Sequence, residues 1–304
     1  MTIFPIIEVP PDAAAGTEPM GTKEKFWLDD SLSGRKYLCK KARSNRGEDW
    51  AEKIAAELCG LLKLPSASYD LAVYRGERQV ISPSFVPEAG ALIAGNEILA
   101  RIIENYPQDS QNPKQHTLDN VFRAIEEEIS ELPPNWASPD ERIGKPADVF
   151  VGYLLLDAWI GNTDRHHENW ACIRWQGRVY LAPTYDHGSC LGRELEDKVR
   201  AERLQTKDRN RTVRVYVEKC QSCLYDRIED KKPLKTFDAF TLAARKYPSA
   251  ARAWLRLLGE ISAENTLTLL ERVPKERITP IAIEFAQAIL KINRDRLLAF
   301  GETL

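Results

Sequence analysis

The sequence lacks the features that mark several large classes of protein. It has no run of about 18 apolar residues, so it contains no transmembrane helix of the usual length. The first five residues have no basic region and do not predict a signal peptide. The formal net charge of −2 gives no general attraction to nucleic acid or to a membrane surface. We therefore expect a globular cytoplasmic protein that spans no membrane and does not bind nucleic acid directly.

Cysteine is also scarce. Six Cys scattered over 304 residues do not form a disulfide framework, which suits a reducing compartment. Cys220 and Cys223 form a C-x-x-C pair, but structural zinc needs four ligands and no second pair with suitable spacing follows. We interpret these two as packing residues, with a redox pair as the alternative.

The most informative stretch is a polar loop that follows a long apolar run. Residues 149–159 are almost entirely apolar and long enough for a buried helix. The loop after them carries Asp164 and Asn169. Two strand-like runs with a Gln-Gly turn between them predict a hairpin over residues 170–183, and Asp186 follows it. The helix and the hairpin are thus expected to bring two carboxylates and an amide together.

These side chains are the ones that phosphoryl transfer from ATP requires. Asp164 has the position of the catalytic base, and Asn169, five residues later, that of a magnesium ligand. Asp186 falls where the metal-binding Asp of the D-F-G segment lies in protein kinases. Magnesium prefers hard oxygen ligands and takes few of them from the protein. The alternative is an ordinary polar surface loop, but three of the four His in the chain lie in the same unit, which favours a kinase.

Residues 160–170 and 181–188 resemble the HipA family of bacterial serine/threonine kinases, known mainly as toxins of toxin–antitoxin systems. The D-R-H-x-x-N order from Asp164 to Asn169 is shared with the phosphatidylinositol kinases. The resemblance extends more weakly over residues 18–300. It implies ATP and Mg²⁺ as cofactors, His166 as a catalytic and ATP-site residue, and a protein substrate such as an aminoacyl-tRNA synthetase. An antitoxin protein is the implied partner, although the additional N-terminal subdomain of the longer HipA proteins is expected to be missing.

The resemblance also assigns an ATP site to the N-terminal part of the chain. Its G-x-x-E-K segment corresponds to residues 21–25, and the ATP-binding candidates there are Gly21, Thr22, Lys23 and Lys25. The strand predicted over residues 36–41 looks like the one that bears the ATP lysine. Lys40 is our candidate for that lysine, because Lys41 points to the opposite face of a strand.

Two further segments complete the implied ATP site. Glu52 lies on an amphipathic helix predicted over residues 47–62 and is the Glu expected to hold the ATP lysine. The residues that resemble the adenine-binding hinge are Pro83, Ser84 and Phe85. From the residues alone, this hinge segment is equally well explained as the end of a strand.

The predicted fold is α+β, a two-lobe protein-kinase-like fold of the HipA type. We expect an N-terminal strand and linker over residues 1–17, a β-rich lobe over 18–86 and a mainly helical lobe over 87–304. The charged segment 196–214 is interpreted as a solvated helix and loop, with a substrate or activation segment as the alternative. For function, the alternatives are a lipid kinase, a small-molecule kinase and an inactive kinase-fold binding module.

Overall fold

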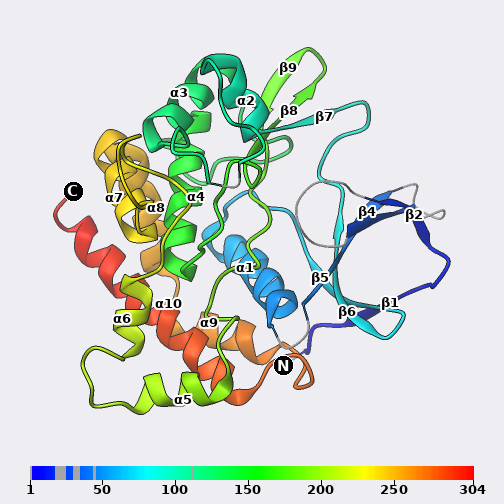
Figure 1. Cartoon of the computed structure of the whole chain (residues 1–304), viewed down its shortest axis with the longest axis vertical. Helices are drawn as coiled ribbons and strands as arrows, with labels where there is room; N and C mark the ends of the chain where they lie inside the picture. Colours follow the sequence, from blue (N-terminus) through cyan, green and yellow to red (C-terminus); the bar gives the residue numbers. More distant parts are fainter. Residues whose placement is uncertain (1, 18–24, 30–34, 44–45, 111) are drawn as a thin grey trace.

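The computed structural model describes residues 2–17, 25–29, 35–43, 46–110 and 112–304. They form an α+β structure of two lobes, with a twisted sheet on one side and a helical lobe on the other (Figure 1). This arrangement confirms the predicted fold class. No helix among the described residues combines the length and the apolar character needed to cross a membrane.

The N-terminal lobe is a six-stranded sheet in the order β1-β5-β6-β4-β3-β2. Its strands are β1 (Ile6–Val9), β2 (Ala14–Thr17), β3 (Lys25–Asp29), β4 (Lys36–Lys41), β5 (Asp70–Tyr74) and β6 (Glu77–Pro83). Strand β1 is parallel to β5, and the other pairs are antiparallel. Arg75 and Gly76 join β5 to β6 with positive φ at both residues, as a tight hairpin turn of the favoured type requires.

Strand β2 was not predicted, since residues 10–16 have the Pro, Ala and Gly content of a linker. The strand forms because its backbone pairs with β3, with Thr17 opposite Phe26. Small residues with low strand propensity are thus extended by a partner strand rather than by their own preference.

Helix α1 (Glu48–Leu62) lies between the sheet and the helical lobe (Figure 1). The sequence predicts an inner stripe of Trp50, Ile54, Leu58 and Leu61 on this helix; the first three are buried, and Leu61 is half-buried against the same core. One side of the helix packs on β5 and β6, and another packs on α8 and α9 of the other lobe. The same helix therefore contributes to the core beneath the sheet and to the core of the helical lobe.

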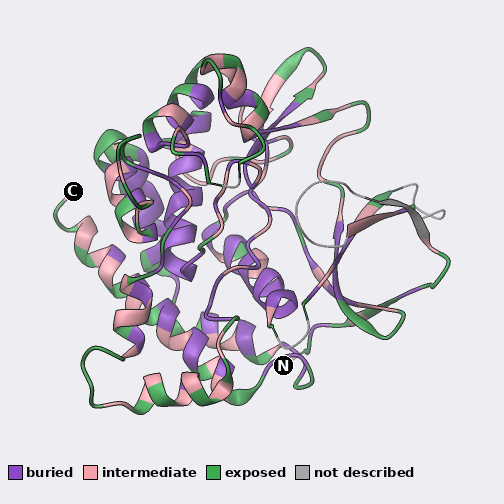
Figure 2. Ribbon diagram, in the orientation of Figure 1, coloured by how far each residue is buried: buried purple, intermediate pink, exposed green. Residues whose placement is uncertain are grey.

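The C-terminal lobe is built around α4 (Pro146–Ile160), in which every residue except Asp148 is buried. Figure 2 shows this helix buried along its length. Each large apolar side chain buried there contributes about 1.5–3 kcal/mol to folding. The surrounding helices are α2 (Gly95–Ile102), α3 (Leu118–Glu128), α5 (Asp197–Gln205), α6 (Val213–Glu218), α7 (Thr236–Lys246), α8 (Pro248–Glu260), α9 (Ala263–Glu271) and α10 (Pro280–Gly301).

A second, smaller sheet positions the segment after α4. It consists of β7 (Ala91–Ala94), β8 (Ala171–Trp175) and β9 (Arg178–Leu181), all antiparallel. The hairpin β8–β9 was predicted, whereas β7 was not; it forms by pairing with β8. Gly161 ends α4 in the left-handed conformation, with φ of 66°. The helix end and the hairpin thus hold both ends of the loop 161–170.

Candidate active site

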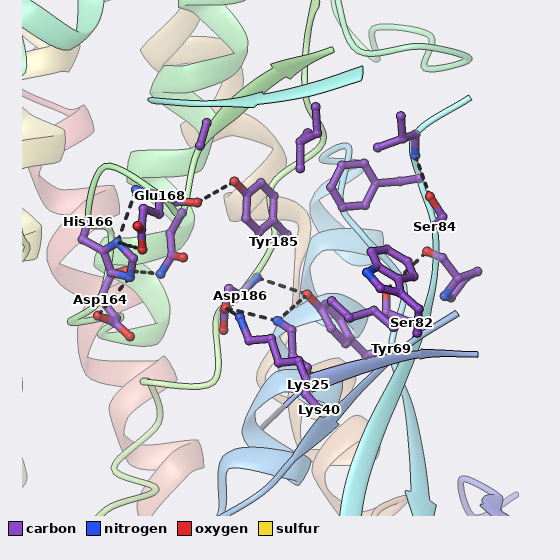
Figure 3. Close-up of a pocket in the computed structure, with 18 residues that line it drawn as sticks. Lys25, Lys40, Tyr69, Ser82, Ser84, Asp164, His166, Glu168, Tyr185 and Asp186 are labelled. Carbon is purple, nitrogen blue, oxygen red and sulfur yellow. Dashed lines mark hydrogen bonds and ion pairs between the residues drawn. The ribbon is translucent and has the colours of Figure 1, made fainter. Parts of the chain in front are cut away.

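A cavity of about 280 Å³ lies between the two lobes. Strands β3, β4 and β6 line it on one side, and the loop after α4 together with residues 185–186 lines it on the other (Figure 3). Most of the predicted site residues are among those that line it: Lys25, Lys40, Pro83, Ser84, Phe85, Asp164, His166, Asn169 and Asp186. Gly21, Thr22 and Lys23 lie outside the described residues.

A buried ion pair fixes the loop that carries Asp164. Asp157, in the last turn of α4, accepts hydrogen bonds from Arg165 Nε at 2.7 Å and from Arg165 Nη2 at 2.8 Å. Burial alone would lower the pKa of Arg165, but the charge of Asp157 outweighs it and the net shift is upward. Because Arg165 is completely buried, this charge is stable there only with its partner.

The ion pair of Asp157 and Arg165 is also linked by hydrogen bonds to both ends of the loop that carries Asp164. Asn162 donates to Asp157 Oδ1 at 2.8 Å and accepts from the backbone N–H of Asp164 at 3.2 Å. Arg165 Nη1 donates to the carbonyl of Asn169 at 2.7 Å. The backbone on both sides of the predicted base is therefore anchored to one buried carboxylate. The sequence carries this signal only as an Asp inside an otherwise apolar helix.

The carboxylate of Asp164 faces the cavity and is oriented by two residues that the sequence did not single out. Ser189 Oγ donates to Asp164 Oδ2 at 3.2 Å, and Arg193 Nη2 donates to Ser189 Oγ at 3.1 Å. Arg193 in turn forms an ion pair with Glu48 of α1, with 3.0 Å between Nη1 and Oε1. A chain of polar contacts thus connects helix α1 to the predicted base.

His166 lies beside Asp164, with 3.9 Å between Nε2 and Oδ1. Its Nδ1 accepts a hydrogen bond from the backbone N–H of Glu168 at 3.2 Å. In the neutral ring the proton is therefore on Nε2, on the side of Asp164. His166 is thus placed to donate a hydrogen bond into the cavity.

Asn169 has the geometry of a cation ligand. Its Nδ2 donates to the carbonyl of Asp164 at 2.6 Å, which fixes the orientation of the amide group. The amide oxygen Oδ1 is the atom that a magnesium ion would use, and Asn169 lines the same cavity as Asp186. One amide oxygen and one carboxylate at a cavity wall are a donor set that fits Mg²⁺, with phosphate oxygens and water supplying the rest.

Asp186, in the C-terminal lobe, forms ion pairs with two lysines of the N-terminal lobe. Its Oδ2 lies 3.1 Å from Lys40 Nζ and 3.5 Å from Lys25 Nζ (Figure 3). Burial alone would lower the pKa of Lys40, but the charges of Asp186, Tyr69 and Glu52 outweigh it and raise the pKa well above its usual value. Lys40 is therefore charged at neutral pH.

Strand alternation places Lys40 and Lys41 as predicted. Lys40 is only 5 % exposed and lines the cavity, whereas Lys41 forms an ion pair with Glu77 at 2.7 Å on the other face of the sheet. Tyr69, which the sequence did not suggest, accepts hydrogen bonds from Lys40 Nζ at 3.4 Å and from the backbone N–H of Asp186 at 3.2 Å. It bridges the two residues.

Glu52 contacts the backbone after Asp186 rather than lining the cavity. It accepts hydrogen bonds from the N–H groups of His187 at 2.6 Å and of Gly188 at 3.1 Å. A Cβ on Gly188 would lie 3.0 Å from Glu52 Oε2, so glycine gives the carboxylate room to approach. The charge of Glu52 contributes to the raised pKa of Lys40. The geometry thus places this carboxylate on the segment that carries Asp186, a contact that the resemblance did not imply.

The far end of the cavity is aromatic and apolar. Phe85 and Tyr185 stack there with 5.5 Å between ring centroids, and Trp27 and Leu38 also line the cavity. Tyr185 is fixed by a hydrogen bond from its hydroxyl to the carbonyl of Glu168 at 2.6 Å. Flat apolar walls of this kind suit a planar heterocycle such as a nucleobase.

Cys220 and Cys223 lie outside this cavity, and neither is in a disulfide. Burial raises the pKa of both thiols to about 12, so both are protonated at neutral pH. Among the described residues, no cluster of three or more His, Cys, Asp and Glu could hold a metal ion. These observations agree with packing residues and give no support to a zinc site.

Comparison with known proteins links this geometry to bacterial kinases. No family model matches the chain. The serine/threonine-protein kinase CtkA of Helicobacter pylori strain J99 is 28% identical over 158 residues, 51% of this chain and 45% of that protein. The match therefore spans less than half the length of this curated relative.

The solved structures extend the likeness to the whole fold. The crystal structure of the H. pylori proinflammatory kinase CtkA has a TM-score of 0.73 and 21% identity, and the match covers 98% of both chains. The Shewanella oneidensis toxin–antitoxin complex of HipA, HipB and operator DNA has a TM-score of 0.56 and 10% identity, covering 97% of this chain and 70% of the matched chain. The fold is that of HipA-like bacterial kinases, as the sequence predicted.

Proposed function

We propose that the chain is an ATP- and Mg²⁺-dependent serine/threonine protein kinase. The observation that carries this proposal is the shared cavity of Asp164, Asn169 and Asp186 from the C-terminal lobe and Lys40 from the N-terminal lobe. The similarity to CtkA supports the choice of a protein rather than a lipid or a small molecule as substrate.

Asp164 is the catalytic base in this proposal. The oxygen of a Ser or Thr hydroxyl attacks the γ-phosphorus of ATP, and its proton passes to Asp164. The new O–P bond forms as the bond between the γ-phosphorus and the leaving oxygen of ADP breaks. Ser189 holds Oδ2 of the base, and His166 lies beside Oδ1, where its Nε2–H can contact the transferred phosphoryl group.

The charged groups at the lobe junction bind the phosphates. Lys40 and Lys25 supply the positive charge, and Glu52 holds the segment that presents Asp186. Asn169 and Asp186 are the proposed Mg²⁺ ligands; the bound ion would neutralise charge on the phosphates. Gly21, Thr22 and Lys23 are proposed to contact phosphate oxygens as the resemblance implies.

The hinge and the aromatic end bind the base of the nucleotide. Pro83, Ser84 and Phe85 line the cavity where β6 ends, next to the ring of Tyr185. Backbone groups of a strand end give hydrogen bonds to adenine, and the stacked rings bury its faces.

The biological role is proposed at the level of the family resemblance. We propose a toxin-like kinase of the cytoplasm that phosphorylates a protein such as an aminoacyl-tRNA synthetase and is held by an antitoxin partner. The likeness in fold to a chain of the HipA–HipB complex supports this choice, as does the low number of cysteines, which suits a reducing compartment. The fold alone does not decide the substrate.

The test is an incubation of the purified chain with radiolabelled ATP and Mg²⁺. Its arms contain purified aminoacyl-tRNA synthetases, phosphatidylinositol vesicles, or neither. Phosphoserine or phosphothreonine on a synthetase, located by mass spectrometry, would support the full proposal. Label in the lipid arm alone would show a lipid kinase, and no transfer with native, nucleotide-binding protein would show an inactive binding module.

A further inference from the structure

A second cavity, of about 510 Å³, opens on the other side of the catalytic loop. It lies between helices α5 and α6 and the segment 219–233. Its lining includes Thr163, Arg203, Tyr216, Lys219 and Cys223. We call it the α6 groove. None of the roles proposed above uses it.

The α6 groove reaches the base through Thr163. This residue is exposed and lines the groove, and the next residue, Asp164, lines the nucleotide cavity. Cys223 Sγ donates to the carbonyl of Thr163 at 3.5 Å, which ties the groove wall to the catalytic loop. A chain segment lying in the groove would therefore have one end beside Asp164.

The charge of this region differs from that of the rest of the protein. Residues 196–235 contain twelve Lys and Arg against eight Asp and Glu, whereas the whole chain has a net charge of −2. Several of these acids already have basic partners: Asp197 pairs with Arg200, Glu202 with Arg211 and Glu218 with Arg214. Twelve basic minus eight acidic residues give residues 196–235, which form most of the groove wall, a net charge of +4.

Two cations at the wall have no carboxylate partner within the part of the chain that the structure describes. Arg203 stacks on the ring of Tyr216, donates from Nη1 to the carbonyl of Arg211 at 3.4 Å, and has a buried Nε without a hydrogen-bond partner. Lys219 is exposed and has no ion pair. The one acid in the lining, Glu194, accepts a hydrogen bond from the Tyr216 hydroxyl at 2.7 Å.

Arg203 and Lys219 thus place two cations without a carboxylate partner at the groove, and a guanidinium can bind a carboxylate through two N–H groups, which favours an anionic ligand. We propose that the α6 groove binds the acceptor segment of the protein substrate, and that this segment carries acidic residues a few positions from the phosphorylated Ser or Thr. Thr163 in the groove lining directly precedes Asp164, so successive residues of an extended segment, which rises about 3.3 Å per residue, would run from the base into the groove. This inference rests on the proposed function and adds a substrate class to it.

Binding is tested first without any transfer of phosphate. The probe is a fluorescein-labelled ten-residue peptide with one Ser flanked by Glu, and the comparison peptides replace Glu by Gln or by Lys. Fluorescence anisotropy with the full chain should rank the Glu peptide tightest and the Lys peptide weakest, with weaker binding at higher salt. Equal binding of the three peptides would overturn the proposal.

Variants then locate the site. Arg203→Glu and Lys219→Glu should each weaken binding of the Glu peptide about tenfold, and Arg203→Lys should retain most of it. Arg174→Glu, the same reversal on the exposed face of hairpin β8–β9, is the control and should change nothing. An unchanged melting temperature shows that each variant is folded. Native-like binding of the Glu peptide by Arg203→Glu or by Lys219→Glu would refute the placement.

A kinetic arm separates this inference from the kinase assignment. With active protein, the Glu peptide should have a KM about tenfold below that of the Lys peptide, and Arg203→Glu should raise KM more than it lowers kcat. Phosphorylation of both peptides with equal KM would refute the groove and leave the kinase intact. Absence of any transfer would refute the kinase, and the anisotropy ranking would still decide the groove. Tighter binding of a ten-nucleotide single-stranded DNA than of the Glu peptide would show a nucleic-acid site instead.

Discussion

The two walls of the nucleotide cavity are held in place by different means. On the C-terminal side, the buried ion pair of Asp157 and Arg165 anchors the loop that carries Asp164. Hydrogen bonds fix the backbone of this loop at both ends. On the N-terminal side, Lys25 and Lys40 reach out from adjacent strands and converge on the single carboxylate of Asp186. The C-terminal wall is held mainly by contacts within its own lobe, with one link to α1 through Arg193 and Glu48, and the N-terminal wall by contacts across the cleft.

This difference indicates which wall of the cavity has its final geometry before ATP binds. Because a buried ion pair with several hydrogen bonds has few alternative arrangements, the catalytic loop keeps its geometry without a ligand. Lys25 and Lys40 instead form ion pairs with Asp186. When ATP binds, the phosphates would take the place of Asp186 beside the lysines, and a cation would take the place of the lysines beside Asp186. We therefore expect substitutions in the anchor of the C-terminal wall, Asp157 and Arg165, to act mainly on stability, and substitutions of the lysines in the N-terminal wall to act mainly on nucleotide affinity.

The largest expected effect tests the buried anchor. Asp157→Ala leaves Arg165 charged, buried and unpaired, which should lower the free energy of unfolding by roughly 3–5 kcal/mol. The control is Asp119→Ala, which removes an exposed pair with Lys246 and should cost no more than about 1 kcal/mol. Urea unfolding followed by circular dichroism gives both values. Equal losses in the two variants would show that the anchor has no special role.

The next largest effect is expected on the rate of phosphate transfer. Asp164→Asn and Asp186→Asn should each lower phosphate transfer about 100-fold or more, because one removes the base and the other a metal ligand. Turnover is measured with purified, folded variants at saturating ATP, with Asp119→Asn as the control. Near-normal turnover in either site variant would refute its assigned role.

The N-terminal wall is tested by a pair of neighbouring lysines. Lys40→Ala should weaken ATP binding about tenfold, since it removes a charge facing the phosphates, whereas Lys41→Ala should leave it nearly unchanged. Isothermal titration calorimetry measures both affinities. The opposite ranking would mean that the strand presents its other face to nucleotide. Lys40→Ala should also destabilise the fold less than Asp157→Ala, because Lys25 still pairs with Asp186.

The smallest expected effect is a loss of folding stability as the pH falls. His116 lies beneath the C-terminal wall, where it accepts from Trp170 Nε1 at 3.2 Å and its Nδ1 contacts the carbonyl of Cys223 at 2.9 Å. Burial lowers its pKa from 6.5 to about 3. A depressed pKa gives stability that is present above the unfolded value of 6.5 and is lost as pH falls. One such His accounts for a loss of about 0.7 kcal/mol between pH 7 and pH 6.

His116→Gln removes this titration and serves as the comparison. Its free energy of unfolding should be lower than that of the native chain at pH 7, but it should fall less steeply toward pH 6. Urea unfolding at the two pH values gives the slopes. Parallel slopes for the two proteins would mean that His116 is not held neutral by the fold.

The sequence by itself determined what depends on neighbours along the chain. The apolar run before Gly161 specifies α4, the alternation of β4 turns Lys40 inward, and the spacing of Asp164 and Asn169 places both on one loop. These features follow from helical and strand periods of a few residues. Together with the resemblance to the HipA family, they predicted the fold class and half of the residues that line the cavity.

Only the tertiary structure decided which distant groups meet. Strands β2 and β7 exist through their partner strands, and Glu52 binds backbone groups 135 and 136 residues away. Ser189 orients Asp164 across 25 residues, and the α6 groove is closed by segments on both sides of α6. Such contacts leave no local pattern, because hydrogen bonds and charges select partners by position in space rather than by separation along the chain.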